Sequence, residues 1–363
     1  MGDKMSEVNK KFENKAFNSS DIPCQEISDQ AVLSIHPKVS VHMITYNHEP
    51  YIAKAIEGVV RQKTEFPIEL IIGEDCSTDR TFKIILAYQK KHPELIRVLT
   101  SNKNVGERNN NNRTIEACRG KYVAICEGDD YWTDPLKLQR QVYFLETNPA
   151  YGMTYSKVRY FIQKKNKYDG VFGGDKETFE DLLLGNSIPT LTTCFRLDLR
   201  QRYNQDIKPE AKNWLMGDYP MWLYFAKESK IKFENKVTGV YRVLENSASN
   251  STNIKKNIEF RKSFIDIGAF FCDKYCINDG ATRQKFELFY SWELFRFWTI
   301  CQAPNFKKQA LEKLANVTGN KSLKLKFVRL TFSFPIFRYL FIIYDHIGLA
   351  ELRQRLKRYG KTP

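Results

Sequence analysis

The chain has 363 residues, of which 42% are hydrophobic, 13% aromatic and 27% charged, with a formal net charge of +15. This composition excludes a disordered or fibrous protein, and the length suits one large α/β domain with a helical extension, or two modest domains. The eight cysteines include no Cys-x-x-Cys pair and no clustered Cys/His spacing, so we expect reduced thiols rather than a zinc site or a disulfide framework.

The positive charge is concentrated near the C-terminus. Residues 302–363 hold thirteen Lys or Arg against three Asp or Glu, which places +10 of the +15 in the last sixth of the chain. The N-terminus is polar and lacks the apolar stretch of a signal peptide. We therefore predict a polar leader over residues 1–37 and a cytoplasmic protein.

Strands and helices alternate from residue 38 to about residue 150. Apolar runs, several rich in β-branched residues, predict strands at 38–47, 68–75, 96–100 and 121–132. Helices are predicted at 51–62, 79–91 and, as a polar helix, around 106–119. This alternation favours βαβ units, with a Rossmann-like sheet flanked by helices.

The pattern changes after residue 150. Strands are expected at 156–165, 188–196 and 231–244, a short helical segment at 181–185, and helices beyond about residue 255. Asp218 is well placed as the N-cap of another helix, with Pro220 in its first turn.

Polar and acidic residues follow three of the predicted strands. Ligands of such sheets collect at the carboxyl ends of the strands, so these residues are expected to meet at one edge. They are Thr45, Tyr46 and Asn47, then Glu74 and Asp75, then Glu127, Asp129 and Asp130.

Asp129 and Asp130 are the pair best suited to a metal. Magnesium and manganese prefer oxygen ligands, and a divalent cation stabilises the charge that develops on a diphosphate leaving group. Gly128 would let the backbone approach the ligand closely. We expect Asp129 to face the ribose and Asp130 the metal, with Asp129 as a second metal candidate. The carboxylate of Asp75 is suited to accept a hydrogen bond from an N–H of a nucleobase. Thr45 could contact the base or the ribose from the opposite wall of the site.

Several motifs resemble the family 2 glycosyltransferases, which have the GT-A fold. The resemblance covers roughly residues 38–250, the region we expect to be the catalytic domain, followed by a basic helical region at 251–363. The motifs occur in order: VHMITYNHEPYI at 41–52, GEDCSTDRT at 73–81, NVG at 104–106, EGDDYW at 127–132, GNSIPTLTTCFR at 185–196, GDYPMWL at 217–223 and YRVLENSAS at 241–249.

The resemblance implies a role for each matching position. The nucleoside would be bound by the residues at the first two strand ends, Thr45, Tyr46, Asn47, Glu74 and Asp75. Asp129 would bind ribose or diphosphate, and Asp130 the Mn²⁺ or Mg²⁺ ion. Asp218 matches the general base that deprotonates the acceptor hydroxyl for in-line attack, with inversion at the anomeric carbon.

Two positions depart from the family pattern. Gly217 stands where the family often has Glu, and Leu244 stands where it often has His, which puts metal affinity in question. Arg242 is a candidate to contact phosphate instead. The Gln-x-x-Arg-Trp motif of processive synthases is absent from the sequence, which favours transfer of a single sugar.

The expected partners follow from this reading. They are a nucleotide diphosphate sugar, with UDP favoured, and a saccharide or lipid-linked acceptor of the cell envelope. The basic C-terminal helices could lie on the inner face of the cell membrane, or pack on the protein or on a second copy. A non-catalytic sugar-nucleotide or membrane-binding scaffold is the alternative, and no nucleic-acid partner is expected because the sequence contains no recognised module.

Overall fold

The computed structural model describes residues 22–245, 254–301 and 308–309. These residues form two compact units that divide between residues 253 and 254. Most of the predicted leader and most of the basic C-terminal region, including the segment considered for membrane contact, lie outside the described residues.

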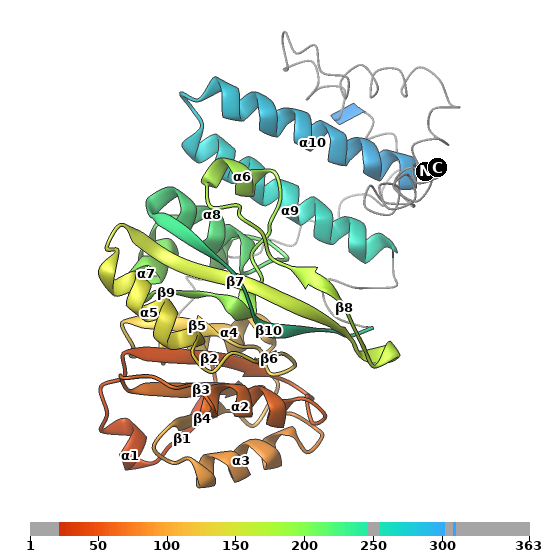
Figure 1. Cartoon of the computed structure of the whole chain (residues 1–363). Coiled ribbons are helices and arrows are strands. Elements are labelled where there is room, and N and C mark those ends of the chain that lie inside the picture. The colour runs from red at the N-terminus through yellow and green to blue at the C-terminus, as the bar shows by residue number, and fades with distance from the viewer. Residues whose placement is uncertain (1–21, 246–253, 302–307, 310–363) are drawn as a thin grey trace, which may run out of the picture. The chain divides into compact units, whose positions relative to one another are not determined.

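The first unit contains a ten-stranded mixed sheet (Figure 1). Its order is β1-β4-β3-β2-β5-β9-β7-β10-β6, and β8 pairs with β7. The four strands β2 to β5 run parallel, whereas β9 is antiparallel to both β5 and β7. The strands are β1 Gln25–Ile27, β2 Val39–Thr45, β3 Ile68–Glu74, β4 Ile96–Thr100, β5 Tyr122–Ile125, β6 Tyr131–Trp132, β7 Tyr151–Ile162, β8 Lys167–Phe172, β9 Cys194–Arg196 and β10 Lys230–Val243.

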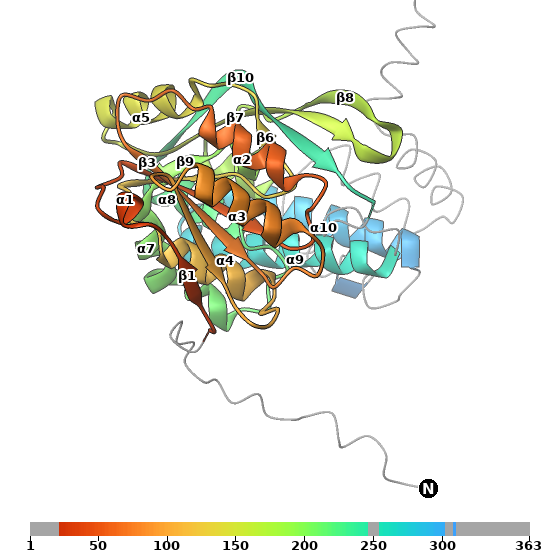
Figure 2. The same cartoon turned by 90° about the horizontal axis from the view of Figure 1, so that it is seen from below.

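Helices cover both faces of this sheet. Figure 2 shows α2 and α5 on one side of the strands and α4 and α7 on the other. Buried apolar residues of α2, α3 and α5 form one core with strands β2 to β5. The helices are α1 Gln30–Leu33, α2 Ile52–Val60, α3 Thr81–Lys91, α4 Glu107–Glu116, α5 Lys137–Thr147, α6 Phe179–Leu183, α7 Leu197–Ile207 and α8 Tyr219–Glu228, with single 3₁₀ turns η2 Gln163–Lys165, η3 Thr190–Thr192 and η4 Pro209–Ala211.

The predicted mixed α/β sheet with flanking helices is confirmed, and several details differ. The strand predicted at 188–196 is limited to Cys194–Arg196, because a 3₁₀ turn occupies Thr190–Thr192. The segment 121–132 is not one strand: β5 ends at Ile125, and the acidic loop then leads into β6, which pairs antiparallel with β10. The folded domain also includes residues before residue 38, because β1 pairs with β4 and Val32 of α1 is fully buried. Short elements of this kind carry too little apolar periodicity to be recognised in a polar stretch.

The second unit contains the two helices α9, Ile254–Tyr275, and α10, Gly280–Cys301. Ile258, Ile265 and Leu294 form its small buried cluster. The expected C-terminal helices are therefore present. Among the described residues, no helix is both long and apolar enough to cross a lipid bilayer.

Because His42 on β2 is buried, we expect acid to lower the free energy of unfolding. Burial lowers the pKa of this imidazole from 6.5 to about 4. Between these values the unfolded chain binds a proton that the folded chain does not, so the free energy of unfolding falls as pH drops from 6.5 toward 4. The loss should reach about 3 kcal/mol. Urea unfolding at pH 7 and pH 4.5 should show a smaller pH effect for His42→Gln than for wild type, and parallel losses would contradict this account.

Candidate active site

The carboxyl ends of three parallel strands meet at one edge of the sheet. Thr45 is paired in register with Glu74 on the neighbouring strand β3. The amide of Asp75 donates to the carbonyl of Thr45 at 3.1 Å, and the amide of Gly128 donates to the carbonyl of Ile44 at 3.0 Å. The loop after β5 therefore runs along the end of β2, as the sequence analysis expected.

Four carboxylates from three parts of the chain share one neighbourhood. Burial, followed by the negative charge of Asp129, raises the pKa of Glu127 to about 8, and Asp218 and Glu107 add to the shift. Burial and then the charges of Asp218 and Asp129 raise the pKa of Glu107. The loop after β5, the start of α4 and the N-cap of α8 thus contribute to a single acidic cluster, which we define as Glu107, Glu127, Asp129 and Asp218.

Asp129 and Asp218 were assigned roles from the sequence, Glu127 was expected at this edge without a specific role, and Glu107 was not expected there. Glu127 precedes Asp129 by two positions, and Glu107 directly follows the NVG motif. Their place next to recognised motifs was the available signal. Nothing in the spacing shows that the start of α4 approaches Asp218, which is more than a hundred residues away.

Polar atoms without protein partners surround the acidic loop. Oε2 of Glu127, Oγ1 of Thr45 and Nδ1 of His48 are buried and make no hydrogen bond among the described residues. A Cβ on Gly128 would lie 2.7 Å from Oγ1 of Thr45 and 3.0 Å from Nδ1 of His48, so only glycine fits between them. Each unsatisfied buried group costs about 1–3 kcal/mol, and such a cost is recovered when a polar ligand binds.

Asp130 lies in different surroundings from Asp129. Asp130 is 3% exposed, and its Oδ1 accepts from the backbone amide of Arg242 at 2.7 Å. Burial, and then the charges of Asp129 and Glu127, raise the pKa of Asp130 well above its usual value. Asp130 therefore joins the acidic loop to β10 while remaining close to Asp129 and Glu127, and Asp129 is only half-buried.

Arg242 holds the same loop through its side chain. Its Nε donates to the carbonyl of Asp129 at 2.7 Å, and its Nη1 donates to Gln163 at 3.0 Å. The guanidinium also lies over three aromatic rings, with centroids 4.7 to 5.5 Å away, those of Tyr51, Tyr131 and Phe161. These contacts direct the cation toward the protein, where it fixes the backbone at Asp129.

The two carboxylates at the end of β3 also accept hydrogen bonds from other parts of the protein. Glu74 accepts from the amides of Cys76 and Ser77 and from the hydroxyl of Thr100. Asp75 accepts from the amide of Val105 at 2.7 Å and from that of Gly106 at 3.0 Å. Both carboxylates shape their loops, and Asp75 keeps lone pairs for a further donor.

The two residues after Thr45 differ from each other. Asn47 has a left-handed backbone with φ of 55°, and its Oδ1 accepts from the amide of Thr78 at 2.8 Å. Its side chain thus stabilises the facing loop. Tyr46 is 43% exposed and offers a ring face to a planar ligand.

Asp218 is the N-cap of α8, as predicted. Its Oδ1 accepts from the amide of Tyr219 at 2.7 Å, and its Oδ2 accepts from the hydroxyl of Thr190 at 2.7 Å. These bonds fix the direction of the carboxylate, and each oxygen retains a lone pair that can accept a proton. A cap and a general base are therefore compatible roles for this residue.

The site can accommodate a divalent cation only together with a further ligand. In the part of the chain that the structure describes, no three His, Cys, Asp or Glu side chains are arranged to hold a metal by themselves. Mg²⁺ commonly takes one or two carboxylates and completes its shell with substrate phosphates and water. Asp129 and the unpaired Oε2 of Glu127 fit that pattern. Leu244, half-buried just beyond β10, provides no metal ligand.

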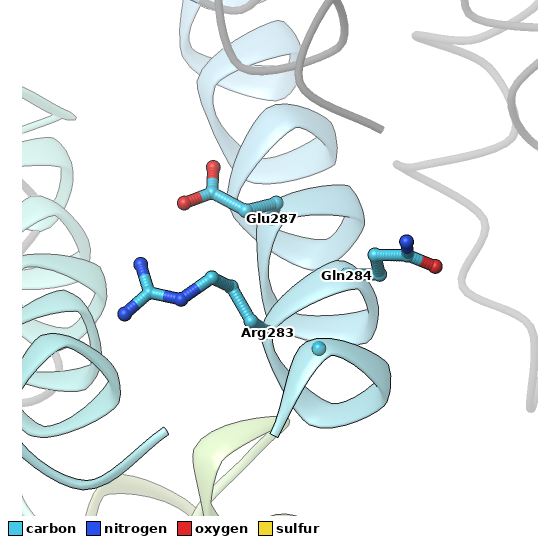
Figure 3. Close-up of a pocket in the computed structure, with 4 residues that line it drawn as sticks. Arg283, Gln284 and Glu287 are labelled. Carbon is cyan, nitrogen blue, oxygen red and sulfur yellow. The ribbon is translucent and has the colours of Figure 1, made fainter. Parts of the chain in front are cut away.

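A separate hollow lies on α10 of the second unit. It is lined by Gly280, Arg283, Gln284 and Glu287, and Figure 3 shows Arg283 and Glu287 on one side of the helix and Gln284 on another. Arg283 is bound at 2.9 Å to Asp273. None of the residues that line this hollow belongs to the acidic cluster or to a strand end of the sheet.

Comparison with known proteins assigns the family. The model of glycosyl transferase family 2 matches residues 40–205. Bacillus subtilis TuaG, a putative teichuronic acid biosynthesis glycosyltransferase, is 30% identical over 218 residues, which are 59% of this chain and 82% of TuaG. The chain therefore belongs to glycosyl transferase family 2.

Two further proteins are similar to this chain. Escherichia coli WfaP, named UDP-Glc:alpha-D-GlcNAc-diphosphoundecaprenol beta-1,3-glucosyltransferase, is 28% identical over 249 residues, covering 66% of this chain and 93% of WfaP. The structure of S. aureus TarS with UDP-GlcNAc matches with a TM-score of 0.55 at 18% identity, covering 77% of this chain and 80% of that one, which confirms the GT-A fold. The chain spans 58% of the length of the first curated relatives that it matches.

Proposed function

We propose that this protein is an inverting, metal-dependent glycosyltransferase that moves one sugar from a nucleotide diphosphate sugar to an acceptor hydroxyl. The observation that carries the proposal is the acidic cluster at the strand ends of a family 2 domain. It combines a carboxylate suited to a metal with a carboxylate suited to a base, and both lie in one electrostatic neighbourhood.

Different residues bind the donor and activate the acceptor. Thr45, Tyr46 and Asp75 border the nucleoside. Asp129 and Glu127 would hold Mn²⁺ or Mg²⁺, which when bound neutralises charge on the diphosphate. Asp130 and Arg242 hold the loop that carries Asp129, so we assign them positioning roles rather than contact with metal or phosphate.

Asp218 acts on the acceptor side as the general base. Its carboxylate takes the proton of the acceptor hydroxyl as the oxygen attacks the anomeric carbon. The bond to the diphosphate breaks on the opposite face, so the configuration inverts. The name of the E. coli relative supports this, because a β linkage made from an α-linked donor such as UDP-glucose is an inversion.

The same relatives support an envelope acceptor. TuaG is named for teichuronic acid, and the name of WfaP specifies a diphosphoundecaprenol-linked sugar. We propose a saccharide or lipid-linked acceptor, with UDP as the carrier, acting on the cytoplasmic side of the membrane.

A donor panel tests this function. UDP-glucose, UDP-GlcNAc and GDP-mannose are added with and without MnCl₂ while thermal unfolding and nucleotide release are followed. At a concentration 100 times Kd, a bound donor should stabilise the fold by about 2.7 kcal/mol, and only when Mn²⁺ is present. Release of nucleotide should follow for the preferred donor. Donor binding without any hydrolysis or transfer would instead support the non-catalytic scaffold, which Leu244 makes the relevant alternative.

A further inference from the structure

The loop that leads into Asp218 contains a glycine directly before the base. It runs from the end of η4 at Ala211 to Gly217, directly before Asp218. Gly217 has no side chain, and a Cβ placed there would meet no atom within 4 Å. Glycine leaves the backbone unusually free, so this loop needs contacts elsewhere to hold its conformation.

Arg108 of α4 provides such contacts from a distant part of the chain. Its Nη1 donates to the carbonyl of Lys212 at 3.2 Å, and its Nη2 donates to the carbonyl of Trp214 at 2.6 Å. The planar guanidinium presents its donors as a rigid fork, so the two bonds together set both the position and the orientation of the loop. Arg108 thus binds the carbonyls of two residues that lie six and four positions before Asp218.

The start of α4 is itself held by the nucleotide side of the site. Asp75 accepts from the amides of Val105 and Gly106, and its own carbonyl accepts from the side chain of Asn104 at 3.0 Å. Gly106 is the residue before α4 begins. The end of β3, the first turn of α4 and the loop before Asp218 are therefore connected by consecutive hydrogen bonds.

From this arrangement we infer that Arg108 is a positioning residue for the base. It fixes the loop of residues 212–217, and through it the approach of the acceptor hydroxyl to Asp218. The inference rests on the proposed function, in which Asp218 is the base. It adds that the loop is held from the same helix start that Asp75 binds.

Hydrogen exchange of the full chain tests the contact without any need for turnover. Arg108→Met keeps the aliphatic length of the side chain and removes both donors. We expect amides of residues 212–218 to exchange about tenfold faster in this variant, which is the size of effect expected from losing hydrogen bonds of ordinary strength. Arg202→Met is the matched control, because Arg202 lies exposed on α7 and its nearest acidic group, Asp198, is 3.9 Å away.

Kinetics then separate positioning from general stability. UDP-glucose with a synthetic GlcNAc-diphospho-lipid, and hydrolysis of UDP-glucose in Mn²⁺, serve as the two assays. Arg108→Met should lower kcat about tenfold and leave the Kd of UDP with Mn²⁺ unchanged, because misplacing a reacting group affects turnover rather than donor affinity. Arg108→Lys keeps the charge beside Glu107 and should lie between wild type and Arg108→Met.

The outcomes can be distinguished. Wild-type exchange at 212–218 in Arg108→Met, or a wild-type kcat in that variant, would overturn the inference. A wild-type protein that neither hydrolyses nor transfers with any donor would overturn the proposed function, and the exchange result would still report whether Arg108 holds the loop. Equal kcat values in wild type and Arg108→Lys would show that charge, rather than the paired donors, is what matters, and would also reject the positioning role.

Discussion

Asp218→Asn is expected to lower the rate of sugar transfer by about 10³-fold while the affinity for UDP and Mn²⁺ stays unchanged. The amide has the shape of the carboxylate and can still accept a hydrogen bond from Tyr219 or Thr190. It cannot take a proton from the acceptor. Single-turnover transfer and calorimetric titration with UDP in MnCl₂ would measure the two quantities separately.

The control for this variant is Asp198→Asn. Asp198 lies exposed in the first turn of α7 and has a weak contact with Arg202. Its replacement removes the same charge from another helix start and should change neither turnover nor binding. Turnover of Asp218→Asn within a few-fold of wild type would remove Asp218 from the mechanism.

Asp129→Asn is expected to raise the Kd of UDP in the presence of Mn²⁺ by about 100-fold, since loss of even an outer-shell partner of a metal costs 10–100-fold. The affinity for UDP without metal should be nearly unaffected. Titrations of wild type and variant with UDP, each in MnCl₂ and in EDTA, measure this difference.

Asp130→Asn provides the matched comparison. Asp130 is buried and bound to the backbone of β10, and an amide keeps the shape of its side chain. The amide oxygen can accept from the amide of Arg242, and we expect metal-dependent binding within a few-fold of wild type. Loss of the metal response in Asp130→Asn, with retention in Asp129→Asn, would restore the assignment first suggested by the sequence.

The sheet was predictable because buried parallel strands have a recognisable pattern of apolar residues in the sequence. The residues of β2 and β3 are nearly all buried, and both strands hold apolar, mostly β-branched residues or leucine before they end in polar ones. The N-cap at Asp218 was also readable, because the Asp and the Pro two residues later are local signals. Such features depend on neighbours along the chain.

Which carboxylates bind donors of the protein, and which remain available to a ligand, was not predictable in the same way. Asp75, Asp129 and Asp130 follow their strands in similar fashion, but Asp75 accepts from amides thirty residues later and Asp130 from one 112 residues later. Which oxygens remain available depends on those distant donors. The same holds for Glu107: its place after the NVG motif was a signal, but the effect of its charge depends on the distant Asp218.

The antiparallel pairing of β6 with β10 has a consequence for how the domain is delimited. Tyr131 and Trp132 are paired with Val240 and Gly239, and Arg242 binds the loop just before them. The region recognised as family 2 ends at residue 205, before α8 and β10 begin. A fragment cut at that point would keep strands β2 to β5 but lose β10, together with Asp218. Because Arg242 holds the acidic loop, we expect that a fragment with the same loop geometry must extend to at least Val243, past the region that the family model matches.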